Sequence, residues 1–591
     1  MYRQADTHQD QVATMMLDMR RFRAGTAAVP LASVVLTISC RDLLDKDVMS
    51  LSDPMVVLYG KEFGLPNWQE VGRTEVVLNS LNPSFARKFT LNYFFEELQF
   101  CRFEVYDIDS QSNNLADHDF LGAVECTLGE LVANKRTELA LTRPGRTPKG
   151  RVVVVVEEAA GVSKEHVYME LAAAGIDRPL VCCCLPGTAN AVLNVLKVRG
   201  GRFEQLVART EPARSQRPHW RPLYLSAHAL CDSNYDNEIT FRVVDVRSNG
   251  RERLIGNWTS SFEKLKHEQG SGLRVQMKKL DGRPAGELIF NSLRLNTEYG
   301  FVDYVQAGTE VRCSIALDFT ASNLDPRNPR SLHYCMDPVR PSDYAVALKC
   351  VGEILQDYTK DKRMPLLGFG ARLADGNTSH CFSVNGNPAD PSCAGVVACL
   401  EAYHACVRNV QLFGPTHFAP VIHHVAQQAA RCLDGRVYHI LLIVTDGVVQ
   451  DMRATIDAVV GATALPLSII IVGVGDENFA AMHALDADDA PLFSAALGRH
   501  ASRDIVQFVR FNDFLPNRGV TMAQPVFAPV LGVAPHLTTH SVGSAPPAAI
   551  HGLRLAKSLL EEVPRQFLSY MKANGVQPQH VKQLRARGAF N

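Results

Sequence analysis

Short apolar segments alternate with polar turns through the first half of the chain. Leu31–Ser39, Pro54–Tyr59 and Val152–Glu157 are rich in Val, Leu and Tyr, and clusters of Asp, Asn, Gly and Pro separate such segments. Strand-length apolar runs bounded by turn residues are typical of an all-β sandwich. The pattern predicts a sandwich over residues 30–157, after a tail over residues 1–29. Further strands are predicted at Arg73–Val77, Arg87–Leu91 and Cys101–Tyr106.

A second copy of this module follows the first. LNPSF and QRPHW align Pro83 with Pro218, FEVYD and FRVVD align Asp107 with Asp245, and FLG aligns with LIG. The offset stays near about 135 residues, and three ordered matches at one offset indicate a tandem repeat. A second sandwich is therefore predicted over residues 163–292.

Beyond these modules, apolar strands alternate with amphipathic helices. This alternation predicts an α/β doubly wound, Rossmann-type domain over residues 305–515, with helices on both faces of a parallel sheet. Residues 516–591 are predicted as a C-terminal tail whose helix, His551–Lys572, could dock or stay apart. The predicted strands are Val311–Leu317, Pro365–Phe369, His439–Val444, Leu467–Val472 and Asp504–Phe511, and the predicted helices are Ser342–Tyr358, Ser392–Val410 and His417–Leu433.

Composition narrows the class of protein. With 591 residues, 46% hydrophobic and 21% charged, the chain has the balance of a multidomain globular protein and not of a disordered or fibrous one. A formal net charge of −1 gives no overall basic field, so no nucleic acid partner is expected. The 15 cysteines are too dilute for a disulfide scaffold and follow no paired zinc spacing, which favours the cytosol.

Carboxylates gather in two loops at one end of the first predicted sandwich. Asp47 and Asp53 flank one loop, and Asp107, Asp109 and Asp119 flank the other. Such carboxylates would repel one another unless a cation neutralised them. Calcium accepts many oxygen ligands in flexible geometry, so the set predicts a calcium site. The alternative for any single Asp is a turn residue whose side chain mimics a backbone hydrogen bond.

These loops resemble those of the C2 domain, through LDKDVMSLSDP, the pair Asn82-Pro83 and the stretch YDID…DFLG. The resemblance implies an eight-stranded sandwich that binds calcium and then an anionic phospholipid membrane. Asp117 competes with Asp119 as the last ligand, and Asp119 is preferred because it directly precedes the predicted strand that begins FLG.

Apolar residues occupy the tip of the first loop. Val48, Met49 and Leu51 would enter the headgroup region of the membrane once bound calcium cancels the negative field. The alternative is that they pack on their own loop.

The second copy loses most of these carboxylates and keeps Asp245 alone, so it is expected to be free of calcium. Its basic loop, with Arg247, Arg251 and Arg253, either attracts anionic lipid at resting calcium or is simply solvated. In the alignment the positions of Asp47, Asp53, Asp109 and Asp119 are taken by Cys184, Asn190, Arg247 and Arg253.

Oxygen-bearing side chains also follow two strands of the predicted α/β domain. One strand runs into Asp318, Thr320 and Ser322, and the strand HILLIV ends in Thr445-Asp446-Gly447. Open α/β sheets place ligands at this carboxyl edge, and oxygen donors suit magnesium or manganese. The alternative is that these residues are helix caps.

The spacing resembles the metal-ion-dependent adhesion site of von Willebrand A domains. The resemblance assigns Asp318, Thr320 and Ser322 to the first loop, Thr416 in FGPTHF to the second and Asp446 to the third. That family usually has serine where Thr320 stands, and threonine keeps the hydroxyl. The resemblance implies an Mg²⁺ or Mn²⁺ ion that leaves one position open for a partner's carboxylate.

Two C2 modules before an A domain, with the strings DFTASN, NGNP and FGPTHFAPVI, resemble the copine family over about residues 30 to 575. The resemblance implies a cytoplasmic, calcium-dependent phospholipid-binding adaptor that carries partner proteins to the plasma membrane or other anionic membranes in trafficking and signalling. No phosphate-loop, HExxH, GxSxG or kinase motif set appears, so no enzymatic activity is expected. The alternatives are a calcium-independent membrane or protein scaffold and a ubiquitin-ligase-related component.

Overall fold

The structure is a computed structural model, and it divides the chain into two compact units. One unit joins Met1–Ala159 to Gly300–Asn591, and the other is Ala160–Tyr299. The described residues are 30–45, 51–62, 67–159, 164–176, 180–182, 185–186, 188–199, 203–247, 251–267, 272–337, 341–486, 490–514 and 547–587.

The first module is a sandwich of two four-stranded antiparallel sheets, as the sequence predicted. Val34, Leu36 and Ile38 are buried and alternate with less buried residues on the first strand, because successive side chains of a strand point to opposite faces. One sheet contains β4 (Ser84–Tyr93), β1 (Ala32–Arg41), β8 (Arg151–Glu158) and β7 (Arg136–Ala140); the other contains β3 (Gln69–Arg73), β2 (Pro54–Glu62), β5 (Gln99–Asp107) and β6 (Asp119–Thr127).

The predicted strand Arg73–Val77 is wrong, because the strand ends where that prediction began. The Thr74 hydroxyl accepts a hydrogen bond from the Val56 amide at 2.9 Å, and the Glu75 carboxylate accepts from the amides of Ala86 and Arg87. Side chains therefore take the backbone donors that a continuing strand would use.

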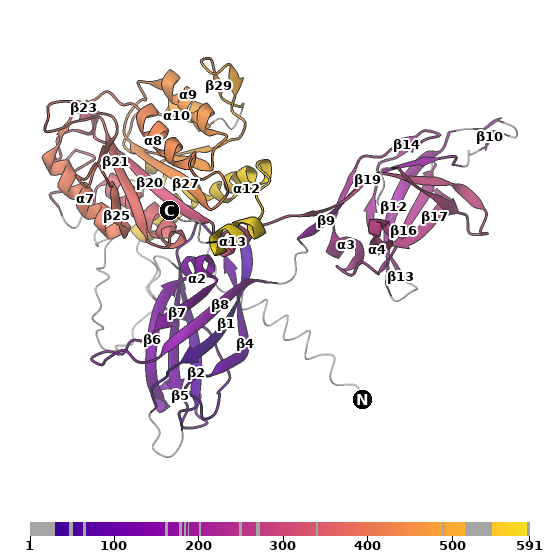
Figure 1. The fold of residues 1–591 in the computed structure, drawn as a ribbon, viewed down its shortest axis with the longest axis horizontal. Helices are drawn as coiled ribbons and strands as arrows, with labels where there is room; N and C mark the ends of the chain where they lie inside the picture. Colours follow the sequence, from indigo (N-terminus) through magenta and orange to yellow (C-terminus); the bar gives the residue numbers. More distant parts are fainter. Residues whose placement is uncertain are drawn as a thin grey trace. The chain divides into compact units, whose positions relative to one another are not determined.

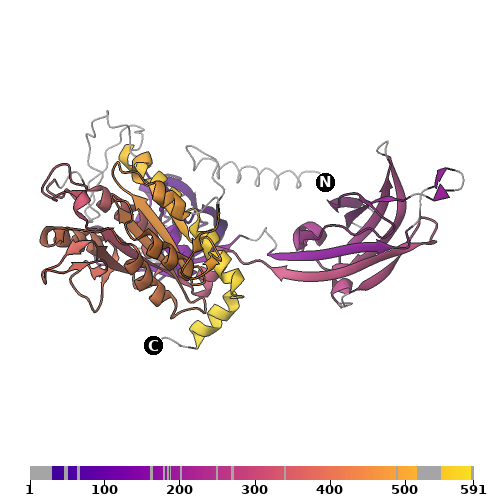
Figure 2. The ribbon, with the colours of Figure 1, turned by 90° about the horizontal axis from the view of Figure 1, so that it is seen from above.

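The second module is also built of antiparallel strands, but here, in the described residues, they join into one nine-stranded sheet, with a separate two-stranded sheet of β10 (Leu180–Cys182) and β11 (Leu185–Pro186). The Thr210 hydroxyl accepts from the Leu193 amide at 3.0 Å, which matches the Thr74 contact of the first copy and confirms the repeat. Two long strands, β9 (Glu165–Ala174) and β19 (Pro284–Thr297), run side by side (Figure 2). In sheet order the strands are β13 (Phe203–Arg209), β12 (Asn190–Arg199), β16 (Glu238–Val246), β17 (Glu252–Ser261), β18 (Leu273–Lys278), β19 (Pro284–Thr297), β9 (Glu165–Ala174) and β15 (Leu223–Ser226), with β14 (Ala213–Arg214) beside β12.

The C-terminal part of the first unit is an α/β domain with a mainly parallel sheet (Figure 1). The order β21-β20-β27-β28-β31 is parallel throughout, which confirms the α/β prediction. The short strand β24 (Phe382–Ser383) pairs antiparallel at one edge. The parallel strands are β20 (Glu310–Asp318), β21 (Arg363–Phe369), β27 (Val437–Thr445), β28 (Leu467–Gly473) and β31 (Val506–Arg510).

Helices cover both faces of this sheet, so its central strands are buried along their whole length. Leu441 and Ile443 of β27 face a core that includes Val421 and Val459. The helices on that face are α8 (Ala419–Ala429), α9 (Met452–Ala462) and α10 (Ala480–Asp486). The other elements that contact the sheet include α6 (Asp343–Leu355) and α7 (Gly395–Asn409).

An aromatic cluster joins the first sandwich to the α/β domain within this unit. The Phe301 ring of α5 (Phe301–Ala307) lies 4.8 Å from the Phe95 ring of the sandwich and 5.0 Å from the Phe567 ring, measured between centroids. Tyr358 also lies against Phe95, and its hydroxyl hydrogen-bonds to the Tyr93 hydroxyl. All five rings are almost fully buried, so the cluster is part of a continuous core.

A buried carboxylate lies beside this cluster. Asp357 is 8% exposed and accepts a hydrogen bond from the hydroxyl of Thr127, the residue before α2 (Leu128–Asn134) of the sandwich. The Lys362 ammonium lies 3.8 Å from it. Burial raises the pKa of Asp357 to about 6, because a charged carboxylate loses hydration there.

This raised pKa predicts a pH-dependent stability. The folded state holds a proton that the unfolded state has released between about pH 4 and 6, so this group's contribution falls as pH rises through that window, by about 3 kcal/mol. Asp357→Asn should remove that part of the pH dependence. Thermal unfolding of both proteins at several pH values across this window tests it, and parallel stability curves would contradict it.

The C-terminal segment forms three helices in place of the one that the sequence predicted. Pro564 and Pro578 stand at the starts of the second and third helices, where a missing amide donor costs little. Phe567, Tyr570 and Val581 are buried, so these helices are packed into the unit. The helices are α11 (Pro547–Leu560), α12 (Val563–Ala573) and α13 (Pro578–Ala586).

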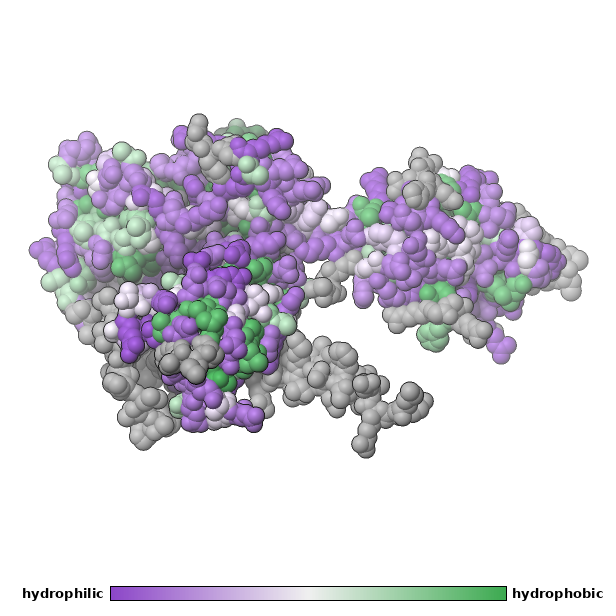
Figure 3. All heavy atoms as spheres, turned by 60° about the horizontal axis from the view of Figure 1, so that its bottom comes forward, coloured by the Kyte–Doolittle hydropathy of each residue, from purple (hydrophilic) through white to green (hydrophobic). Residues whose placement is uncertain are grey.

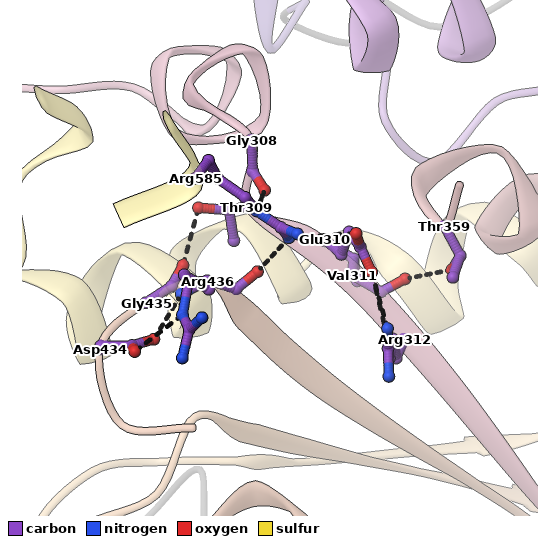
Figure 4. Close-up of polar contacts among 10 residues, drawn as sticks. All are labelled: Gly308, Thr309, Glu310, Val311, Arg312, Thr359, Asp434, Gly435, Arg436 and Arg585. Atoms are coloured by element: carbon purple, nitrogen blue, oxygen red, sulfur yellow. Dashed lines mark hydrogen bonds and ion pairs between the residues drawn. The ribbon is translucent and has the colours of Figure 1, made fainter. Parts of the chain in front are cut away.

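Hydrogen bonds and an ion pair of Arg585 connect α13 to the start of β20 (Figure 4). Its guanidinium donates to the Gly308 carbonyl at 2.8 Å and to the Arg436 carbonyl at 3.0 Å. It also lies 3.1 Å from the Glu310 carboxylate, and these two side chains are only 13% and 8% exposed. Both charges are therefore compensated in a dry environment.

Arg585→Ala should remove one of the two arginines that pair with Glu310 and lower the free energy of unfolding by about 2 kcal/mol, because Arg312, 3.0 Å from the same carboxylate, remains. Thermal unfolding combined with hydrogen exchange should show the loss, with faster exchange in α12 and α13. Lys582→Ala, at an exposed position of the same helix, is the matched control and should change neither. Equal effects of the two substitutions would argue against the anchoring role.

Candidate functional site

The candidate metal centre lies at the carboxyl edge of the parallel sheet. Asp318 ends β20, and Asp446 directly follows β27, which is paired with β20 in parallel register. The chain passes from β20 to β21 on one side and later to β27 on the other, which makes this a topological switch point. The fold thus brings together two carboxylates that are 128 positions apart.

Hydrogen bonds connect the predicted ligands directly. The Ser322 hydroxyl donates to Asp446 Oδ1 at 2.9 Å and lies 2.9 Å from the Thr320 hydroxyl. The Thr320 amide donates to Asp318 Oδ1 at 2.9 Å, and the Thr445 hydroxyl donates to Asp318 Oδ2. One continuous network therefore joins the first and third loops.

Thr416 approaches the same point from the second loop. A Cβ atom added to Gly447 would lie 3.3 Å from Thr416 Oγ1 and 3.9 Å from Ser322 Oγ. The Gln450 side chain accepts from the Thr416 amide, and the Thr416 carbonyl accepts from the Gln450 amide, which fixes the loop. All five residues assigned by the sequence are thus adjacent, and Ser322 is the exposed member.

The two buried carboxylates of this centre are costly to ionise without a nearby positive charge. Burial raises the pKa of Asp318, and burial together with the nearby Asp318 charge raises the pKa of Asp446. Two carboxylates and three hydroxyls form a purely oxygen donor set, which suits a hard divalent cation. The residues therefore fit Mg²⁺ or Mn²⁺. Among the described residues no group of three or more His, Cys, Asp or Glu side chains could hold a metal. The A-domain centre has two carboxylates, and its other donors are hydroxyls.

His333, Tyr403 and Ser342 form a buried hydrogen-bonded group, here called the brace, that supports the first loop. The sequence analysis missed these three residues. His333 Nε2 lies 2.8 Å from the Asp318 carbonyl and His333 Nδ1 lies 2.9 Å from the Tyr403 hydroxyl. Burial lowers the pKa of His333 to about 4, so it is neutral, with Nε2–H donating and Nδ1 accepting. Ser342 completes the brace at 2.9 Å from the Tyr403 hydroxyl. No motif marks these residues, because they meet only in the fold.

Gly447→Ala is predicted to weaken Mg²⁺ binding by about 10- to 100-fold, because its methyl group would intrude between Thr416 and Ser322. Isothermal titration calorimetry with MgCl₂ on the full chain measures this. The matched control is Gly461→Ala, whose added Cβ would meet only Leu497 at 3.9 Å. Equal affinities in both variants would show that no metal binds between these loops.

The described calcium-loop residues lie at one end of the first sandwich, where β5 ends and β2 and β6 begin. Asp107 is 1% exposed and accepts from the Asp53 amide at 2.6 Å, while Asp53 accepts from the Asn79 amide. Asp107 is directly opposite Asp119 in the sheet register. Asp109 and Asp119 are exposed. Asp47, Val48 and Met49 lie outside the described residues.

Asp117, the alternative last ligand, is held within its own loop. The Ser112 hydroxyl donates to its carboxylate at 2.5 Å, and it belongs to a short 3₁₀ helix, Leu115–Asp117. Asp119 instead starts β6 beside Asp107.

The second module shows what replaces the missing carboxylates. Asp245 accepts from the Asn190 amide at 2.9 Å, as Asp107 does from Asp53 in the first module. Arg253 is opposite Asp245 in the register and lies 3.6 Å from its carboxylate. An arginine therefore supplies the cation at the position that Asp119 holds in the first copy. Cys184 lies outside the described residues.

Exposed apolar side chains surround the calcium end of the first sandwich. Leu51 is 41% exposed, Val76 37% and Leu78 69%. Figure 3 turns this end of the domain forward and shows hydrophobic residues gathered on it. Val76 and Leu78 come from the loop between β3 and β4. The sequence analysis placed Val76 in the predicted strand Arg73–Val77 and named neither residue as a membrane contact. The hydrogen bond from the Leu51 amide to Asn79 ties the two loops together.

Comparison with known protein families assigns the two β modules and the α/β domain to known domain types. Family models match the chain as C2 domain over residues 33–142 and 187–277 and as Copine over residues 331–579. Similar solved structures include BON1-C2B, 20% identical over 23% of this chain and 94% of that chain, with a TM-score of 0.20. The two calcium-bound C2 domains of Extended-Synaptotagmin 2 are 17% identical over 46% of this chain and 100% of that chain, with a TM-score of 0.19. Scores this low carry no structural argument, so the assignment rests on the family models.

Fold and sites together define a class, a protein with tandem C2 modules joined to an A-type domain that carries an oxygen-ligand centre. This order is the architecture of the copine family, and the chain belongs to that family. Its C2 and Copine domains support calcium-dependent phospholipid binding at membranes. In the part of the chain that the structure describes, no helix is both long and apolar enough to cross a bilayer.

Proposed function

We propose that this chain is a cytoplasmic adaptor without enzymatic activity that binds anionic phospholipid in a calcium-dependent manner and recruits partner proteins through its A domain. The observation that carries the calcium step is the contrast between the two C2 modules. The second module neutralises Asp245 with Arg253, whereas the first has Asp119 at that register position. The first module therefore pairs a carboxylate with a carboxylate at this position, where the second module pairs a carboxylate with an arginine, and this contrast supports calcium binding by the first module.

The residues at the loop end of the first module explain how calcium would control lipid binding. Without a cation, the exposed carboxylates of Asp109 and Asp119 present negative charge to an anionic surface and repel it. Bound calcium would supply the opposing positive charge. Leu51 and Leu78 are already exposed at this end, so their apolar side chains can then enter the headgroup region. The protein would move from the cytosol to the plasma membrane or another anionic membrane.

The A-domain centre would supply the recruiting step. Asp318, Ser322 and Asp446, with Thr320 and Thr416, would hold Mg²⁺ or Mn²⁺ at the carboxyl edge of the sheet. The bound ion would offer one open position to a carboxylate of the partner. Exposed Ser322 marks the side from which a partner can approach.

A calcium-independent lipid contact through the second module is the second candidate. Arg247 and Arg251 lie at the same end of that module as Asp245 and Arg253. The Arg253 contact with Asp245 directs one of the three arginines inward, which leaves a smaller basic surface than the sequence suggested.

Liposome sedimentation tests the calcium step. The full chain should sediment with phosphatidylserine vesicles in calcium and stay soluble in chelator, and Asp107→Asn with Asp109→Asn should abolish the response. Because Asp107 is buried, Asp109→Asn alone, at an exposed position, provides a variant with little risk to folding and should raise the calcium requirement. Asp446→Ala is the matched control and should sediment like the native chain. Equal sedimentation with calcium and chelator would refute the proposal and favour the scaffold.

A further inference from the structure

Each of the three loops of the A-domain centre displays one large exposed apolar side chain. Leu324 on the first loop is 44% exposed, Phe413 on the second 42% and Val448 on the third 49%. We call these three residues the apolar rim. Scattered exposed apolar residues are common on protein surfaces, but one on every loop of a single centre forms a local group.

The rim residues must lie close to the metal ligands. Leu324 follows Ser322 by two positions, and Val448 follows Asp446 by two. The Phe413 carbonyl accepts from the Ala321 amide at 2.9 Å, which places the second loop directly beside the first. With about 3.8 Å between successive Cα atoms, none of the three can be far from the centre.

A positive charge accompanies the rim at Phe413. The Arg372 guanidinium carbon lies 3.8 Å from the centroid of the Phe413 ring, a cation–π contact that holds both side chains in place. Arg372 Nε is buried and has no hydrogen-bond partner among the described residues. The Phe413 side of the rim therefore presents both an apolar face and a cation.

The backbone of Leu324 gives an independent reason to assign the rim a role. Its dihedral angles, φ 64° and ψ 164°, lie in a region that is populated almost only by glycine. A leucine here strains the backbone and exposes its side chain, so neither feature helps the domain to fold. Such strain is common where a loop is shaped for a ligand.

We infer that the A-domain centre receives a segment of a partner protein in which an acidic residue is flanked by large apolar residues, with a second acidic group on the Phe413 side. This inference rests on the proposed function, because the first carboxylate would occupy the open metal position. The apolar flanks would cover Leu324, Phe413 and Val448, and the second carboxylate would meet Arg372. A free phosphate or a sugar offers nothing for the rim to cover.

Selection of peptides from a random library on the full chain in MgCl₂ tests this inference. Enriched peptides should carry Asp or Glu beside Leu, Ile, Phe or Val. Fluorescence anisotropy of a selected peptide should show binding that EDTA removes. Leu324→Ser, Phe413→Ser and Val448→Ser should each weaken it about tenfold or more. Arg372→Gln should remove the preference for the second acidic residue. Val397→Ser, at an exposed position of α7, is the matched control and should bind normally.

The outcomes separate the inference from the proposed function. Magnesium-dependent acidic peptides without apolar neighbours, bound equally by the rim variants, overturn the inference and leave the proposed metal centre intact. Failure to obtain any magnesium-dependent peptide, or unchanged binding to Asp446→Ala, contradicts both.

Leu324→Gly provides a test that a purely structural leucine would fail. Glycine adopts the observed backbone without strain, so this variant should raise the melting temperature while it weakens peptide binding. A lower melting temperature together with unchanged binding would show that Leu324 serves the fold and not the partner.

Discussion

Carboxylates at the ends of buried strands lose hydration and repel one another. In this structure, arginines or neutral hydrogen-bond donors offset that cost. Glu310 at the start of β20 is opposed by Arg585, and Asp245 in the second module is opposed by Arg253. At the opposite end of β20, Asp318 and Asp446 have only hydroxyls and amides around them in the described residues. Where an arginine compensates the charge the site is structural; where only neutral donors do, a metal ion has a reason to bind.

The two C2 modules show how little sequence change is needed to switch between these states. Their backbone contacts agree closely, since the amides of Asp53 and Asn190 donate to equivalent carboxylates. What differs is the residue opposite that carboxylate, Asp119 in one copy and Arg253 in the other. The second copy thus keeps the fold and balances the charge of Asp245 with Arg253, without calcium. The module can therefore be stable whether or not it binds calcium.

The first unit also couples elements that are far apart in the chain. Phe301 follows the second module, yet its ring packs between Phe95 of the first sandwich and Phe567 of a C-terminal helix. Tyr358, which ends the segment after α6, joins the same cluster. At the other end of α6, the N-cap residue Ser342 belongs to the brace of the metal loop. The helix therefore connects the sandwich contact to the candidate metal centre through one rigid element.

The sequence by itself determined the local elements and the ligand types. Strand periodicity, the repeat offset and the Asp318-to-Ser322 spacing depend on neighbouring residues, so they are visible along the chain. The tertiary structure alone decided which distant groups meet: His333 beneath Asp318, Arg253 against Asp245 and Arg585 against Glu310. Such contacts have no sequence period, because they depend on strand register and helix packing, which place residues side by side only when the whole core forms.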